Sequence, residues 1–183
     1  MQRLGIFLLV ILGIAAAVLY STTYIIRETN QAIVLEFGAE VGEPKTEAGL
    51  YFKLPYQSVN YFDKRVLNLD PEPESFLLVD QKPLVVDYYL RYKIVEPLAY
   101  FKAVGTEAVA VSRLKKTVNG KMRAALGQAT LEDVLSDKRI QILAEVQKSV
   151  AEDTKGLGID VVDVRIGKAD LPAQISRNVY DRM

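Results

Sequence analysis

The chain begins with an apolar stretch and then changes to alternating patterns of apolar and polar residues. Residues 4–26 carry no charge and lie between Arg3 and Arg27. A helix rises about 1.5 Å per residue, so this stretch reaches roughly 34 Å and covers a hydrocarbon core of about 30 Å. The pattern therefore predicts a transmembrane anchor over residues 4–26, preceded by a short tail of residues 1–3.

Two other interpretations of this stretch are weaker. A cleaved signal peptide would use Ala15–Ala17 as its cleavage site, but a signal core is typically about 7–15 residues long and this apolar run continues to Ile26. A buried core helix would normally show a polar side. Arg3 and Arg27 nearly balance each other, so the basic residues barely decide the orientation. The short N-terminus favours a cytoplasmic start, with the remainder exported.

Period-two alternation after the anchor predicts a strand-rich subdomain over residues 27–95. The expected strands cover residues 31–37, 50–56, 59–62, 65–69, 75–79 and 84–94. In the first of them we expect Ile33, Leu35 and Phe37 to share one face. The aromatic residues of 51–62 allow a second membrane contact, but aromatic residues are ordinary in strands, and we expect them in the sheet core.

From residue 96 onward the apolar spacing changes to three and four residues, which indicates helices. The pattern predicts helices from Pro97 to Gly105, from Thr106 to Gly127 and from Ser136 to Gly156, then a strand over 159–168. These elements form a mixed subdomain over residues 96–172. A last helix over residues 173–183 has no stop signal, so we expect it to be cut short by the end of this sequence. Strands followed by a mixed region predict an α+β fold.

Composition narrows the chemistry. The chain has 23 Lys and Arg against 23 Asp and Glu and a pI near 6.4, so no basic field favours nucleic acid as a partner. It has no cysteine and no histidine. These absences exclude thiolate nucleophiles, the Ser-His-Asp triad and zinc sites built from Cys or His. Most familiar catalytic arrangements are therefore excluded.

Two arrangements of residues remain as candidates for a catalytic or metal site. Ser112 has Lys115 and Lys116 at helical spacing, which a serine nucleophile with a lysine base would require, as in a hydrolase at a lipid surface. A basic run on a helix is more typical of a solvated face, since a lysine base must be desolvated. Asp160 and Asp163 resemble metal ligands, but three residues apart on a strand they are expected on opposite faces. We assign no catalytic, cofactor-binding or metal-binding residue.

Several short motifs in order resemble one family over nearly the whole chain. They are Ala32–Gly38, Ala48–Pro55, Asp63–Arg65, Val86-Asp87, Arg91–Ile94, Arg139, Gly158–Ile166, Leu171-Pro172 and Val179–Met183. They resemble the stomatin, prohibitin, flotillin and HflK/HflC (SPFH, band 7) family, and the C-terminal block is most similar to the bacterial HflC branch. Ala48 departs from the family, which usually has proline there.

The resemblance implies a single-pass transmembrane helix followed by an SPFH domain on the periplasmic side of the bacterial inner membrane. It implies a non-catalytic scaffold without cofactors, which assembles with an HflK-like partner into a ring or cage around the FtsH AAA+ protease and modulates degradation of membrane proteins. The alternative is a general stomatin-like organiser of membrane microdomains that is not tied to FtsH. In the family a coiled-coil helix follows the residues matching Arg182-Met183 and supports oligomerisation.

Overall fold

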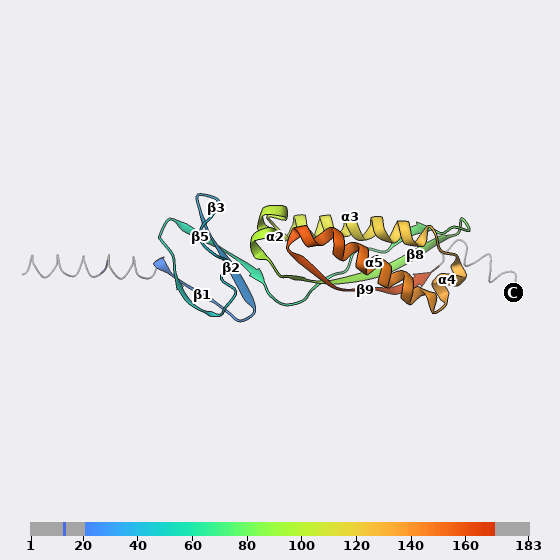
Figure 1. Ribbon diagram of the computed structural model, residues 1–183, viewed down its shortest axis with the longest axis horizontal. Coiled ribbons are helices and arrows are strands. Elements are labelled where there is room, and N and C mark those ends of the chain that lie inside the picture. The colour runs from blue at the N-terminus through green and yellow to red at the C-terminus, as the bar shows by residue number, and fades with distance from the viewer. Residues whose placement is uncertain (1–12, 14–20, 171–183) are drawn as a thin grey trace, which may run out of the picture. The chain divides into compact units, whose positions relative to one another are not determined.

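A short β-ribbon and a small sheet form the first part of the computed structural model, which describes Gly13 and residues 21–170 (Figure 1). Strand β1 (Thr23–Ile26) pairs antiparallel with β4 (Gly49–Phe52). Strand β2 (Asn30–Glu36) lies between β3 (Ala39–Glu40) and β5 (Gln57–Asp63), also antiparallel. Tyr24, Ile26 and Ala32 form the buried centre, on which Val34, Tyr51 and Val59 pack.

The structure corrects the C-terminal end of the predicted anchor. Most of it, residues 4–20, falls outside the described part except Gly13, and the predicted helix over residues 173–183 also lies outside it. Thr23–Ile26, however, form strand β1 rather than the end of a helix. These residues are β-branched or aromatic and find hydrogen-bonding partners in β4, which favours a strand. Among the described residues, no helix combines the length and apolar character needed to cross a bilayer.

A four-stranded sheet with helices on one face forms the second part. Strand β8 (Pro83–Ile94) pairs along one edge with β6 (Leu67–Leu69) and β7 (Glu74–Leu77), and along the other with β9 (Ile159–Asp170). Every second residue of β8 is buried, as the alternation predicts: Leu84, Val86, Tyr88, Leu90, Tyr92 and Ile94. This buried face is the one that the helices cover.

The helices are α2 (Pro97–Val104), α3 (Glu107–Leu126), α4 (Leu131–Leu135) and α5 (Lys138–Thr154), followed by the 3-10 turn η1 (Lys155–Leu157). Figure 1 shows α3 and α5 side by side along β8 and β9. Helix α3 buries a stripe at four-residue spacing: Ala110, Leu114, Val118, Met122 and Leu126. Helix α5 buries Val146, Val150 and Thr154, whereas Ile140, which the sequence pattern places on the same stripe, is 69% exposed.

The chain separates into two compact units, of which the first ends at Arg65 and the second begins at Val66. This division comes earlier than the boundary expected at residues 95 and 96. The reason is the pairing of β8 with β9, which runs from Val85 opposite Asp170 to Ile94 opposite Ile159. Strands β6, β7 and β8 therefore belong with the helices that follow them. The α+β order of strand-rich part and helices is as predicted.

Candidate functional site

The β1–β4 ribbon turns apolar side chains toward solvent on one face. Ile25, Leu50 and Phe52 are 66, 59 and 72% exposed, and Ile25 is paired directly with Leu50. The opposite face carries Tyr24 and Tyr51, whose rings stack with centroids 5.7 Å apart. A half-buried antiparallel ribbon normally alternates apolar residues inside with polar residues outside. This one is apolar on both faces, so its outer face is a candidate contact surface.

This outer face lies where the chain arrives from the predicted anchor. Phe52 is paired with Thr23, and the backbone amide of Lys53 donates a hydrogen bond of 2.7 Å to the carbonyl of Thr22. The exposed end of β4 is thereby fixed next to residues 21–23, directly after the predicted spanning stretch. Exposed aromatic and aliphatic side chains in such a position suit the interface of a bilayer.

A second exposed aromatic group lies at the tip of the β2–β3 hairpin. Phe37 and Gly38 form its two-residue turn, with φ of 49° and 88°. Phenylalanine rarely adopts a positive φ, and strained, exposed residues of this kind gather at functional sites. Phe37 is 89% exposed, and its ring stacks on that of Tyr56 with centroids 5.9 Å apart and planes 12° apart.

The expectation that these aromatics fill the sheet core is thus right only in part. Tyr51 is half-buried against the core, but Phe52, Tyr56 and Tyr61 are 72, 53 and 47% exposed. Phe37 was expected on the same face as the buried Ile33 and is instead at a turn. Sequence reasoning also did not identify Ile25 and Leu50 as exposed residues of a candidate contact surface. The signal that could have identified them is the presence of apolar residues on both faces of two short neighbouring strands.

The serine and lysines considered as a catalytic pair lie on the surface of α3. Ser112 and Lys116 are exposed, and the ammonium of Lys115 lies 3.8 Å from a carboxylate oxygen of Glu74. A lysine base needs burial away from water and from ionic partners. These surroundings provide neither condition.

The two aspartates of β9 share a face of the sheet, contrary to the expectation from their spacing. A bulge at Val162 shifts the register, so Asp160 lies opposite Lys93 and Asp163 opposite Arg91. Arg91 and Arg165 donate hydrogen bonds of 2.9 and 2.6 Å to Asp163. Partial burial raises the pKa of that carboxyl, but these two hydrogen bonds outweigh it and leave the pKa below its usual value. Within the described residues no three acidic side chains gather as metal ligands.

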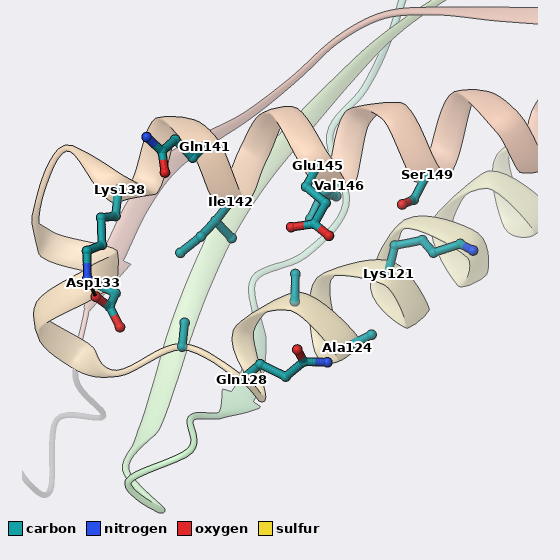
Figure 2. A pocket seen from close by; sticks show the side chains of 12 residues that line it. Lys121, Ala124, Gln128, Asp133, Lys138, Gln141, Ile142, Glu145, Val146 and Ser149 are labelled. Carbon is teal, nitrogen blue, oxygen red and sulfur yellow. Dashed lines mark hydrogen bonds and ion pairs between the residues drawn. The ribbon is translucent and has the colours of Figure 1, made fainter.

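A groove of about 370 Å³ separates the C-terminal half of α3 from the N-terminal half of α5. Figure 2 shows Ile142, Glu145 and Val146 on the α5 side and Ala124 on the α3 side. An ion pair of 2.6 Å between Lys138 and Asp133 lies at one end of the groove. The hydrogen bond from Lys138, helped by that from Thr130, lowers the pKa of Asp133 to about 2. Seven of the twelve residues that line the groove are polar or charged, and we assign it no ligand.

Comparison with known proteins adds relatives that cover nearly the whole chain. It is 31% identical to Protein HflC of Haemophilus influenzae, with 97% of this chain and 64% of that protein aligned. It is 26% identical to the Modulator of FtsH protease HflC of Escherichia coli K12, with 94% of this chain and 66% of that protein aligned. The chain thus spans slightly less than two thirds of these relatives. The model of the SPFH domain / Band 7 family matches residues 24–183, from β1 onward, and the chain belongs to that family.

Proposed function

We propose that this chain is part of a membrane-anchored, non-catalytic scaffold that assembles with an HflK-like partner around an FtsH-like protease and modulates the degradation of membrane proteins. In this proposal the anchor crosses the bacterial inner membrane with its N-terminus in the cytoplasm and the SPFH domain in the periplasm. The name of the Escherichia coli relative, a modulator of FtsH protease, supports the choice of protease.

The observation that carries the proposal is the apolar outer face of the β1–β4 ribbon beside the predicted anchor. Full burial of a leucine or phenylalanine side chain is worth about 1.5–3 kcal/mol, so Leu50 and Phe52 together contribute a few kcal/mol when they enter an apolar phase. Contact with the bilayer would hold the first unit against the membrane surface. An anchored subunit is confined to two dimensions, which raises its effective concentration and lets modest contacts close an assembly.

Membrane contact is tested directly because the chain contains no tryptophan. In a Phe52→Trp variant reconstituted in vesicles, brominated lipid should strongly quench the tryptophan fluorescence. Leu77→Trp, in the second unit, is the matched control because Leu77 is an exposed strand residue as well, at 59%. Equal quenching at both positions, or none at residue 52, would count against the proposed contact between the ribbon and the bilayer.

The regulatory part is tested by purification of the full-length protein after mild solubilisation. An HflK-like protein and the protease should both accompany it. If neither does, the protease-regulating function is wrong. In that case lateral segregation of lipids, with protease substrates unchanged, would support the stomatin-like organiser instead.

A further inference from the structure

An open cavity of about 540 Å³ lies at the end of the sheet where β7 turns into β8. Asp80 and Lys82 of that turn line one side of it, and residues 130–132 with Leu135 and Ser136 line the other. A carboxylate oxygen of Asp80 lies 2.9 Å from the ammonium of Lys82, so this ion pair joins two residues of the turn itself. The cavity is thus a gap between the β7–β8 turn and α4.

Apolar side chains gather around this cavity without being buried. Leu135 lines it and is 70% exposed, and Leu131 is half-buried. Leu77 and Val79, which lead into the turn, are also exposed. The backbone amide of Val79 donates a hydrogen bond of 3.1 Å to the carbonyl of Ala129, which fixes the turn next to the start of α4. Exposed aliphatic side chains around a cavity indicate a surface that another segment covers.

The chain leaves the sheet beside this cavity. The last described residue, Asp170, lies opposite Val85 in the pairing of β9 with β8, and Val85 is three residues from Lys82 on the cavity wall. At about 3.3 Å per residue, this separation is roughly 10 Å along the strand. Residues 171–183, which follow, lie outside the described part of the chain. An extended chain covers up to about 3.5 Å per residue, so this segment reaches the cavity within a few positions.

The sequence of residues 171–183 has the apolar spacing that such a surface needs. Ile175, Val179 and Met183 recur at four-residue spacing, which places them on one side of the helix predicted over residues 173–183. Leu171 continues the same spacing before that helix. Most of the stability of a helix in a protein comes from the packing of its apolar side. The apolar side of this helix therefore needs a surface to cover it.

From these placements we infer that residues 171–183 dock as a helix on the second unit of the same chain, with Ile175 in the cavity beside Leu135. The segment that would occupy the cavity is the one that emerges next to it, so the entropic cost of docking is that of closing a short loop. The contact fixes where the chain leaves the second unit. It concerns a single chain and does not depend on the proposed scaffold function.

Disulfide trapping tests the docking, since the chain has no cysteine of its own. The full-length chain with Leu135→Cys and Ile175→Cys is co-expressed in membranes in two forms that carry different tags. A disulfide needs Cα atoms within about 7 Å, and we expect oxidation to join the two cysteines within one chain. The product keeps the mass of a single chain and migrates faster than the reduced form.

Two control pairs move one cysteine away from the expected contact. Arg177→Cys with Leu135→Cys keeps the same segment but turns the thiol to the other side of the predicted helix, because two residues are about 200° apart. Val109→Cys with Ile175→Cys uses another exposed apolar residue, about 25 Å from the end of α3 at Leu126. Both pairs should form a disulfide at least tenfold more slowly than the 135–175 pair.

Three results of this experiment would overturn the inference. The first is the absence of a 135–175 disulfide. The second is an equal rate for Ile175→Cys and Arg177→Cys, which would show that the apolar side of the segment does not face the cavity. The third is a product that carries both tags, which would show that the segment covers the cavity of a second copy.

The accessibility of the cavity gives a second measurement. In a chain with Leu135→Cys alone, the docked helix should protect this thiol from a water-soluble maleimide. Adding Ile175→Asp replaces the apolar side chain in the contact by a charge, so the rate of labelling should rise by about tenfold. Gln174→Asp, which lies outside the apolar stripe, is the matched control and should leave the rate unchanged. Equal rates in all three chains would show that the segment does not cover Leu135.

Discussion

Gly158 is the position at which a single methyl group should be least tolerated. It follows η1 and precedes β9 with a φ of +69°, and a Cβ there would lie 2.4 Å from the carbonyl oxygen of Glu96 and 2.8 Å from the amide nitrogen of Tyr100. Both contacts are backbone atoms of the first turn of α2, where the amide of Tyr100 donates to the carbonyl of Glu96. The obstacle therefore cannot move away as the end of a flexible side chain could.

The expected cost of Gly158→Ala has two parts. The left-handed backbone costs an alanine about 1–2 kcal/mol, and an overpacked contact costs typically another 1–3 kcal/mol. The sum is about 2–5 kcal/mol in the free energy of unfolding, a large share of the stability of an ordinary domain.

Two other glycines allow the backbone cost and the packing cost to be measured separately. Gly38 has a φ of +88° but open space around its Cβ position, so Gly38→Ala should cost only the backbone part, about 1–2 kcal/mol. Gly156 has open space and no positive φ, so Gly156→Ala should be neutral or slightly stabilising, by less than about 1 kcal/mol. Pulse proteolysis of the full-length chain across a urea series measures all three. If Gly158→Ala destabilises no more than Gly38→Ala, the packing of Gly158 against α2 is not as described.

Two further variants test local electrostatics and capping. Asp163 has a lowered pKa, so its ion pairs stabilise the fold above pH about 4, and this stability is lost as the pH falls through the lowered pKa. In Asp163→Asn the free energy of unfolding, measured with urea, should therefore fall less steeply at acid pH than in the unchanged chain. Curves of unfolding free energy against pH that superimpose for the two proteins would contradict this. Thr130 and Asp133 form a reciprocal capping box at the start of α4, so Thr130→Ala should lower the stability by about 1 kcal/mol, whereas Thr130→Ser should retain most of it. Hydrogen exchange of the α4 amides measures both variants, and equal protection in the two would count against the cap.

Local rules predicted the elements of the second unit well. Period-two alternation identified β8, and Pro97 and Gly105 gave the start and end of α2. Each of these features acts through a few neighbouring residues. Ile140 was misplaced because helical spacing does not show where along α5 burial begins, and the buried residues of this helix are Val146, Val150 and Thr154.

The candidate site was harder to predict because it depends on which strand lies beside which. Phe52 and Leu50 are ordinary strand residues by composition, and only the pairing of β4 with β1 places them outward beside Ile25. The bulge at Val162 also followed from pairing, since it arises from the register between β8 and β9.

The sequence by itself determined the long apolar stretch at the N-terminus, the α+β order of elements and the absence of histidine and cysteine chemistry. These follow from residue types and short-range spacing, which an unfolded chain already carries. The tertiary structure alone decided which apolar faces stay exposed and where the two units divide. Those outcomes depend on contacts between distant segments, as between β8 and β9, and burial is a property of the packed whole rather than of any residue.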